Sequence, residues 1–155
     1  MTQSDIKKIV ENLIQTFLDA GKISIDLRKK GLTKEIKSDN TPVSNGDLEV
    51  NKILSKKILS LTPNIPIVSE ETSENKSKNN LENFWLIDPI DGTYDYINDL
   101  DEFTINAGLI IQKKPVAGLI YAPAKNRMFY SYGDDFSFEL INGEPIKLDL
   151  SLIHI

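Results

Sequence analysis

The sequence predicts an α+β fold in which two N-terminal helices pack on a largely antiparallel sheet. Apolar residues recur at helical spacing in two segments before residue 61, and short apolar segments separated by turn residues follow from residue 67 onward. Helices followed by a meander of strands are typical of layered α+β domains. A chain of 155 residues is long enough for one domain with a hydrophobic core.

The two helices are predicted from their apolar stripes. The first should run from an N-cap at Ser4 to about Lys29, with Gly31 as its C-terminal stop. The second should span residues 46–60, with Ser44 or Asn45 as its N-cap. Residues 34–37 between them are predicted as a short strand, and residues 38–42 as a loop. The stripes consist of Ile6, Ile9, Val10, Leu13, Ile14, Phe17 and Leu18, and of Val50, Ile53, Leu54, Ile58 and Leu61.

The strands are predicted from apolar segments bounded by turn residues. Residues 67–69 form a short buried strand, and residues 71–83 a polar surface loop. The continuous apolar segment 84–87 predicts a central strand that ends at Asp88-Pro89, since proline cannot donate to a ladder. A short helix or turn should open at Gly92. Further strands are expected at 103–112, 116–122, 127–132, 136–141 and 145–148, with turns at 113–115, 123–126 and 142–143.

Composition excludes several classes of function. The formal charge of −5 argues against non-specific nucleic-acid binding, which needs a cationic surface. The chain has no cysteine, and its single histidine is His154 at the tail, so thiolate zinc sites and a Ser-His-Asp triad are not expected. No apolar segment approaches the length of a membrane span, and the N-terminus does not resemble a signal peptide. We expect a cytoplasmic protein, with peripheral association with the inner membrane left open.

Acidic residues follow two of the predicted strands. Asp88 and Asp91 flank a proline just after the central strand, and Glu70 follows the short strand at 67–69. Magnesium prefers oxygen ligands, and closely packed carboxylates repel one another unless cations lie between them. A turn at the proline would let both aspartates converge and expose the Ile90 carbonyl. The alternative is that these acids only solubilise turns, which is the interpretation we adopt for Glu71, Asp95, Asp99, Asp101 and Glu102.

Gly92 and Thr93 are compatible with phosphate binding beside these acids. Glycine allows close backbone approach, N–H groups at a helix start can hold a phosphate oxygen, and a threonine hydroxyl can orient a water. The alternative is an ordinary Asp-Gly turn with a threonine cap.

Three ordered motifs resemble those of the inositol monophosphatase superfamily. Residues 88–93 read D-P-I-D-G-T, residues 69–71 read S-E-E, and residues 37–47 resemble K-x-D-x-T-P-V-[ST]-x-x-D. The similarity covers residues 4–148. Residues 102–110 and 118–124 further resemble the bacterial 3′(2′),5′-bisphosphate nucleotidases within that superfamily. Three motifs in order are far more specific than one short match.

The resemblance implies a layered sugar-phosphatase-type fold, two or three Mg²⁺ ions and a role for each motif residue. Glu70, Asp88 and the Ile90 carbonyl would hold one ion, Asp88 and Asp91 a second, and a third would lie near Glu70. Asp47 and Thr93, assisted by Glu70, would align and deprotonate the attacking water. The substrate phosphate would be held by Asp91, Gly92 and Thr93. Gly46 stands where alanine is common, which we expect to matter little.

The chain also differs from the family pattern. Family members carry a second half with a W-D-x-A-A-G-like motif that completes the second metal site, and nothing after Thr93 resembles it. We therefore expect the chain as given to be a weak or inactive catalyst. Leu150 to Ile155 are what the DNA string CTGTCTCTTATACACATC encodes, which is the start of a transposon mosaic-end adapter used in sequencing libraries. We hypothesise a metal-binding domain at 1–149 and a non-native tail at 150–155; a natural apolar tail is the alternative.

The leading functional interpretation is hydrolysis of 3′-phosphoadenosine 5′-phosphate to AMP and phosphate. The partner would be this small phosphorylated nucleotide, without nucleic acid, and the oligomeric state is not predicted. An inositol monophosphatase or another sugar phosphatase is the alternative within the same class. A non-catalytic metal-binding fragment is the alternative from another class.

Overall fold

The computed structural model describes residues 1–37, 42–72 and 80–149. Residues 38–41 of the predicted loop at 38–42, part of the predicted loop at 71–83, and the proposed tail at 150–155 lie outside the described residues. Pro42, predicted as the last residue of that loop, instead begins a strand. Within the described part, no helix is long and apolar enough to cross a membrane. The elements are α1 (Gln3–Lys30), β1 (Lys34–Ile36), β2 (Pro42–Ser44), α2 (Asn45–Leu61), β3 (Ile67–Ser69), β4 (Phe84–Asp91), α3 (Thr93–Ile97), β5 (Thr104–Ile111), β6 (Lys114–Ala122), the 3₁₀ turn η1 (Pro123–Lys125), β7 (Arg127–Ser131), β8 (Ser137–Ile141) and β9 (Glu144–Lys147).

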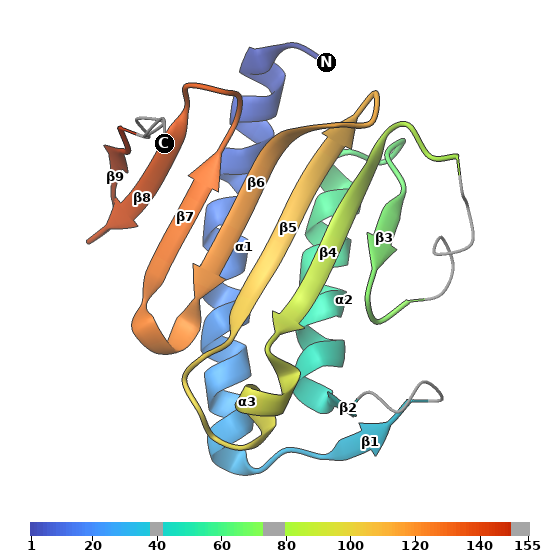
Figure 1. Cartoon of the computed structure of the whole chain (residues 1–155), viewed down its shortest axis with the longest axis vertical. Coiled ribbons are helices and arrows are strands. Elements are labelled where there is room, and N and C mark those ends of the chain that lie inside the picture. Colours follow the sequence, from blue (N-terminus) through green and yellow to red (C-terminus); the bar gives the residue numbers. More distant parts are fainter. Residues whose placement is uncertain (38–41, 73–79, 150–155) are drawn as a thin grey trace, which may run out of the picture.

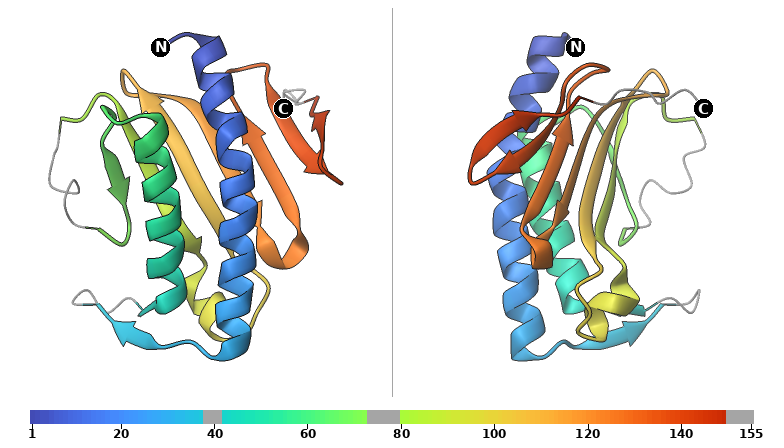
Figure 2. Two further views of the ribbon diagram at one scale, coloured as in Figure 1. Left: turned by 180° about the vertical axis from the view of Figure 1, so that it is seen from behind. Right: turned by 60° about the vertical axis from the view of Figure 1, so that its left-hand side comes forward.

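A seven-stranded sheet in the order β3-β4-β5-β6-β7-β8-β9 forms the centre of the fold (Figure 1). Strand β3 pairs parallel with β4, and every later pair is antiparallel. The long helices α1 and α2 lie side by side on one face of this sheet (Figure 2). The predicted α+β fold, with two helices on a largely antiparallel sheet, is therefore confirmed.

The N-cap of helix α1 lies two residues before the predicted cap. Thr2, not Ser4, is the N-cap: its backbone N–H donates to Asp5 Oδ2 over 2.8 Å, and Asp5 N–H donates back to Thr2 Oγ1 over 3.2 Å. This reciprocal capping box satisfies N–H groups that the helix itself leaves unpaired. The helix ends at Gly31, as predicted, where a φ of 95° suits glycine.

Helix α2 begins at Ser44, one of its two predicted caps. Ser44 Oγ accepts from Gly46 N–H over 3.1 Å, and the N3 residue Asp47 accepts from the Ser44 backbone N–H over 2.8 Å. Its apolar stripe packs against α1 and β4. The capping box thereby fixes a carboxylate at the very start of the helix.

Strand β4 runs past the proline at which it was predicted to end. Asp88 pairs with Asn106 and Asp91 with Thr104, so two residues of β4 lie opposite one of β5. Such an irregularity bends a strand, and it accommodates Pro89, whose missing N–H the ladder does not need there. The prediction was wrong because a proline at a bulge does not terminate pairing.

Two tight turns join the later strands. The β5–β6 turn lies at Gln112 and Lys113, with φ values of 51° and 61°, so Lys114 and Pro115 belong to β6 rather than to the predicted turn. The predicted turn at residues 142–143 is confirmed, with φ values of 52° and 83°. Paired positive φ values match the right-handed twist of hairpin strands.

The sheet face opposite the helices is not covered by any element of the described part (Figures 1 and 2). A cavity of about 570 Å³ lies against this face. Leu86 on β4 and Ile120 on β6 line it and are 51% and 49% exposed. Asp88 reaches the rim of the same cavity, so the apolar face adjoins the acidic strand end.

Candidate active site

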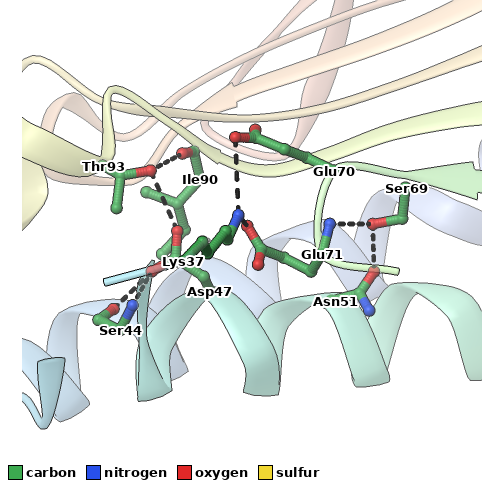
Figure 3. Close-up of polar contacts among 9 residues, drawn as sticks. All are labelled: Lys37, Ser44, Asp47, Asn51, Ser69, Glu70, Glu71, Ile90 and Thr93. Atoms are coloured by element: carbon green, nitrogen blue, oxygen red, sulfur yellow. Dashed lines mark hydrogen bonds and ion pairs between the residues drawn. The ribbon is translucent and has the colours of Figure 1, made fainter. Parts of the chain in front are cut away.

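Asp47 is a buried carboxylate held from two sides. Its Oδ2 accepts from the Ser44 hydroxyl over 2.6 Å and from the Ser44 N–H over 2.8 Å, and its side chain has no exposure. Its Oδ1 lies 3.2 Å from the Thr93 hydroxyl, at the start of α3 (Figure 3). A buried acid with both oxygens occupied is held in one orientation.

Thr93 links Asp47 to the end of β4. Its hydroxyl, which has a single proton, has a second acceptor within reach, the Ile90 carbonyl oxygen at 2.9 Å (Figure 3). The residue before it, Gly92, has a φ of 91°, and a Cβ placed there would lie 2.6 Å from the Glu102 carbonyl oxygen. Only glycine fits this turn, which brings the Thr93 hydroxyl back over the strand end.

Among the carboxylates of the site, Asp88 has the pKa that is shifted furthest from its ordinary value. Burial, followed by the negative charge of Glu70, raises the pKa of Asp88 from 3.8 to about 7. Its Oδ1 is buried and has no hydrogen-bond partner within the described residues. Neighbouring Asp91 is engaged by Asn106, whose Nδ2 donates to Asp91 Oδ2 over 3.1 Å. An orphaned buried carboxylate oxygen among like charges is the environment that a cation would stabilise.

Glu70 and Glu71 follow β3, and a lysine lies between their carboxylates. The Lys37 ammonium is 2.8 Å from Glu71 Oε1 and 3.8 Å from Glu70 Oε1 (Figure 3). The Glu71 side chain is only 3% exposed, and burial raises its pKa although Lys37 opposes the shift. The interpretation of Glu71 as a solvated turn acid was therefore wrong.

The predicted metal ligands come together at one end of the sheet without forming a finished ligand set. Glu70 interacts with Asp88, and Asp91 ends the same strand. Within residues 1–37, 42–72 and 80–149, no group of three or more His, Cys, Asp or Glu side chains is already arranged to hold a metal ion. The raised pKa and the orphaned oxygen of Asp88 fit a cation, whereas the full predicted ligand set remains a prediction.

Sequence reasoning missed Asn51 and gave no role to Ser69, the first residue of the S-E-E motif, although both support this site. Asn51 on α2 is 8% exposed, and Ser69 at the end of β3 is 1% exposed. The Ser69 hydroxyl donates to Asn51 Oδ1 over 2.7 Å. The available signal was the spacing: Asn51 lies four positions after Asp47, so both fall on one side of the helix.

The fold is of the layered sugar-phosphatase type: two helices lie on one face of the sheet, and acidic residues lie at the ends of β3 and β4. The chain belongs to the inositol monophosphatase family, whose model matches residues 5–150. The predicted superfamily is thereby confirmed.

Curated relatives and solved structures resemble the chain over most of its length. A 3′(2′),5′-bisphosphate nucleotidase CysQ of Haemophilus influenzae is 37% identical over 77% of this chain and 45% of its own length. The CysQ of Buchnera aphidicola is 34% identical over 94% of this chain and 56% of its own. The chain thus spans about half the length of these relatives.

Solved structures show the same fold at lower identity. The extragenic suppressor protein suhB of Bartonella henselae has a TM-score of 0.77 and 22% identity, covering 91% of this chain and 54% of its own. A structure described as an IMPase/NADP phosphatase complexed with NADP and Ca²⁺ has a TM-score of 0.76 and 20% identity, covering 94% of this chain and 54% of its own.

Proposed function

We propose that the chain carries the metal-binding part of a Mg²⁺-dependent phosphomonoesterase acting on the 3′-phosphate of 3′-phosphoadenosine 5′-phosphate. The observation that carries the proposal is Asp88, a carboxylate with an orphaned buried oxygen and a pKa raised to about 7 beside Glu70. A bound cation would give the orphaned oxygen a partner and would neutralise the repulsion between the Asp88 and Glu70 carboxylates. The CysQ relatives support the nucleotide substrate, and the Ca²⁺ in a solved relative of the same fold supports a divalent ion.

The chain's own oxygens would hold two or three Mg²⁺ ions. Glu70, Asp88 and the Ile90 carbonyl are proposed for one ion, and Asp88 with Asp91 for a second. When bound, the ions would supply the positive charge that activates water and stabilises the phosphate. A histidine base is not needed in such chemistry.

Asp47 and Thr93 are proposed to orient and help deprotonate the attacking water, with Glu70 assisting. When the Ile90 carbonyl binds an ion, the Thr93 hydroxyl would donate its single proton to Asp47 Oδ1, and the lone pairs of the Thr93 oxygen would accept a hydrogen bond from water. The backbone N–H groups of Gly92 and Thr93, beside Asp91, would hold the phosphate. Because Gly92 carries no side chain, a phosphate oxygen can approach the backbone at this turn closely.

Because the chain spans about half the length of its CysQ relatives, catalysis by this chain alone is expected to be weak. Inositol or sugar phosphates are the alternative substrates, and a metal-binding fragment without catalysis is the alternative from another class. The proposed location is the cytoplasm. Neither the fold nor the relatives support association with an inner membrane.

The test is phosphate release from 3′-phosphoadenosine 5′-phosphate, with and without Mg²⁺. It is run on this chain and on the product of the gene re-amplified from source DNA, with inositol 1-phosphate as the competing substrate. Asp88→Asn should abolish release, while Asp95→Asn, a nearby acid with no proposed role, should preserve it. Equal Mg²⁺-dependent activity in Asp88→Asn would refute the proposed ligand.

A further inference from the structure

The turn after β3 is held by a side chain of helix α2. The Ser69 hydroxyl donates to Asn51 Oδ1 over 2.7 Å, and both side chains are buried. The same Ser69 oxygen accepts the Glu71 backbone N–H over 3.2 Å (Figure 3). A chain of hydrogen bonds therefore runs from the helix through Ser69 into the backbone of the turn.

This turn determines where two consecutive carboxylates point. The Glu70 backbone N–H donates to the Ile87 carbonyl of β4 over 3.1 Å, so the turn is fixed from the sheet as well as from the helix. The Glu71 side chain goes inward to Lys37 and is 3% exposed. The Glu70 side chain is 44% exposed and interacts with Asp88.

We propose that Asn51 is a positioning residue for the Glu70 carboxylate, acting through Ser69. The inference rests on the metal site proposed above. The Asn51 amide oxygen accepts a hydrogen bond from the Ser69 hydroxyl. This orients the hydroxyl so that its oxygen accepts a hydrogen bond from the Glu71 N–H. Without that acceptor, a buried hydroxyl loses its partner and the turn loses its connection to helix α2. Glu70 then loses its fixed direction, and affinity for divalent ions falls.

The experiment measures Mg²⁺ binding by calorimetry, which does not depend on catalysis. Asn51→Leu removes the acceptor at similar size, and Ser69→Ala removes the hydroxyl. Each should weaken Mg²⁺ binding roughly tenfold, as is usual for residues that orient metal ligands. Because Asn51 and Ser69 act as one unit, the double variant should bind Mg²⁺ no more weakly than whichever single variant has the lower Mg²⁺ affinity. Ser69→Thr keeps the hydroxyl and should restore most of the affinity.

Two control variants separate positioning from general loss of stability. Ser55→Ala removes another hydroxyl that contacts Asn51 Oδ1, at 3.4 Å, and that comes from α2 itself. Thr62→Val removes two other buried hydrogen bonds, the one from Trp85 Nε1 at 3.1 Å and the one to the Ile58 carbonyl at 2.9 Å. Both controls should bind Mg²⁺ within twofold of the unmodified chain. Equal weakening in Thr62→Val would overturn the inference.

Glu70→Gln and Asp88→Asn, measured in parallel, separate the inference from the metal site on which it rests. If these two bind Mg²⁺ like the unmodified chain, the metal site and the inference fail together. If they lose binding while Asn51→Leu and Ser69→Ala retain it, the inference alone fails. Should Asn51→Leu not fold, the contrast between Ser69→Ala and Ser69→Thr decides, and equal affinity of these two would refute it.

Discussion

The Thr93 hydroxyl lies 3.2 Å from Asp47 Oδ1, although the two residues are 46 positions apart in the chain. Asp47 opens α2 and Thr93 opens α3, so two helix starts meet over the end of β4. The capping box at Ser44 holds Asp47, and the Gly92 turn holds Thr93. Local caps thus create a long-range pair of a carboxylate and a hydroxyl, and this is the pair proposed above to orient the attacking water.

Asp47→Asn is expected to lower the rate of phosphate release about 100-fold, the lower range for loss of a group that assists proton transfer. Mg²⁺ affinity should change little, because Asp47 is not a proposed ligand. The measurement is steady-state phosphate release at saturating Mg²⁺, with calorimetry on the same sample. An unchanged rate at saturating Mg²⁺ would remove Asp47 from the mechanism.

In the presence of EDTA, stability should fall as the pH rises from about 4 to about 7. Asp88 has a folded-state pKa of about 7 and an ordinary value of 3.8, so between these values the folded chain binds more protons than the unfolded chain. Asp88→Asn should flatten the profile in this window. The measurement is the free energy of unfolding in urea at pH 5 and pH 7.5, for both chains. The assignment would be contradicted if the unmodified chain were more stable at pH 7.5 and Asp88→Asn showed the same pH dependence.

Gly46→Ala is expected to destabilise the chain by about 1–3 kcal/mol, the range for overpacking a filled site. A methyl group there would overlap the Tyr96 hydroxyl and would lie 2.6 Å from Tyr96 Cε1. This geometry argues against our expectation that glycine at this position matters little, because Tyr96 fills the space that alanine would need. In a Tyr96→Leu background, Gly46→Ala should lower the free energy of unfolding much less. Equal losses in both backgrounds, measured by urea unfolding, would show that Tyr96 is not the cause.

The open face of the sheet is expected to make this chain self-associate. Leu86 and Ile120 are about half exposed on a face that no described element covers, and contiguous exposed apolar surface favours association. Leu86→Lys and Ile120→Lys should raise the monomer fraction in sedimentation while changing the free energy of unfolding by less than about 1 kcal/mol. Leu59→Lys, on α2 and 46% exposed, is the matched control and should have no such effect. An unmodified chain that sediments as a monomer would contradict this expectation.

The sequence predicted what depends on local periodicity. Both helices, the hairpin turn at residues 142–143 and the meander follow from spacing and turn chemistry, and they were confirmed. The α1 cap was missed because Thr2 and Ser4 are both suitable cap residues, and the structure shows that Thr2 forms the capping box with Asp5. The continuation of β4 past Pro89 was missed because a bulge depends on the partner strand, which local sequence does not reveal.

The candidate site was predicted through its motifs, and its supporting contacts were not. Glu71 was misinterpreted because its burial depends on Lys37, which lies 34 positions earlier in the chain. Asn51 and Ser69 are 18 positions apart and meet only when α2 packs against the sheet. Contacts of this kind arise from tertiary packing, and periodicity alone does not reveal them.

The most direct measurement of the central claim is an anomalous difference map from crystals of this chain soaked in Mn²⁺ as a stand-in for Mg²⁺. The account predicts an ion in contact with the Glu70 and Asp88 carboxylates and the Ile90 carbonyl, and its loss in Asp88→Asn crystals. Mn²⁺ bound elsewhere with no density at these three residues, or density at them that persists in Asp88→Asn, would contradict the account.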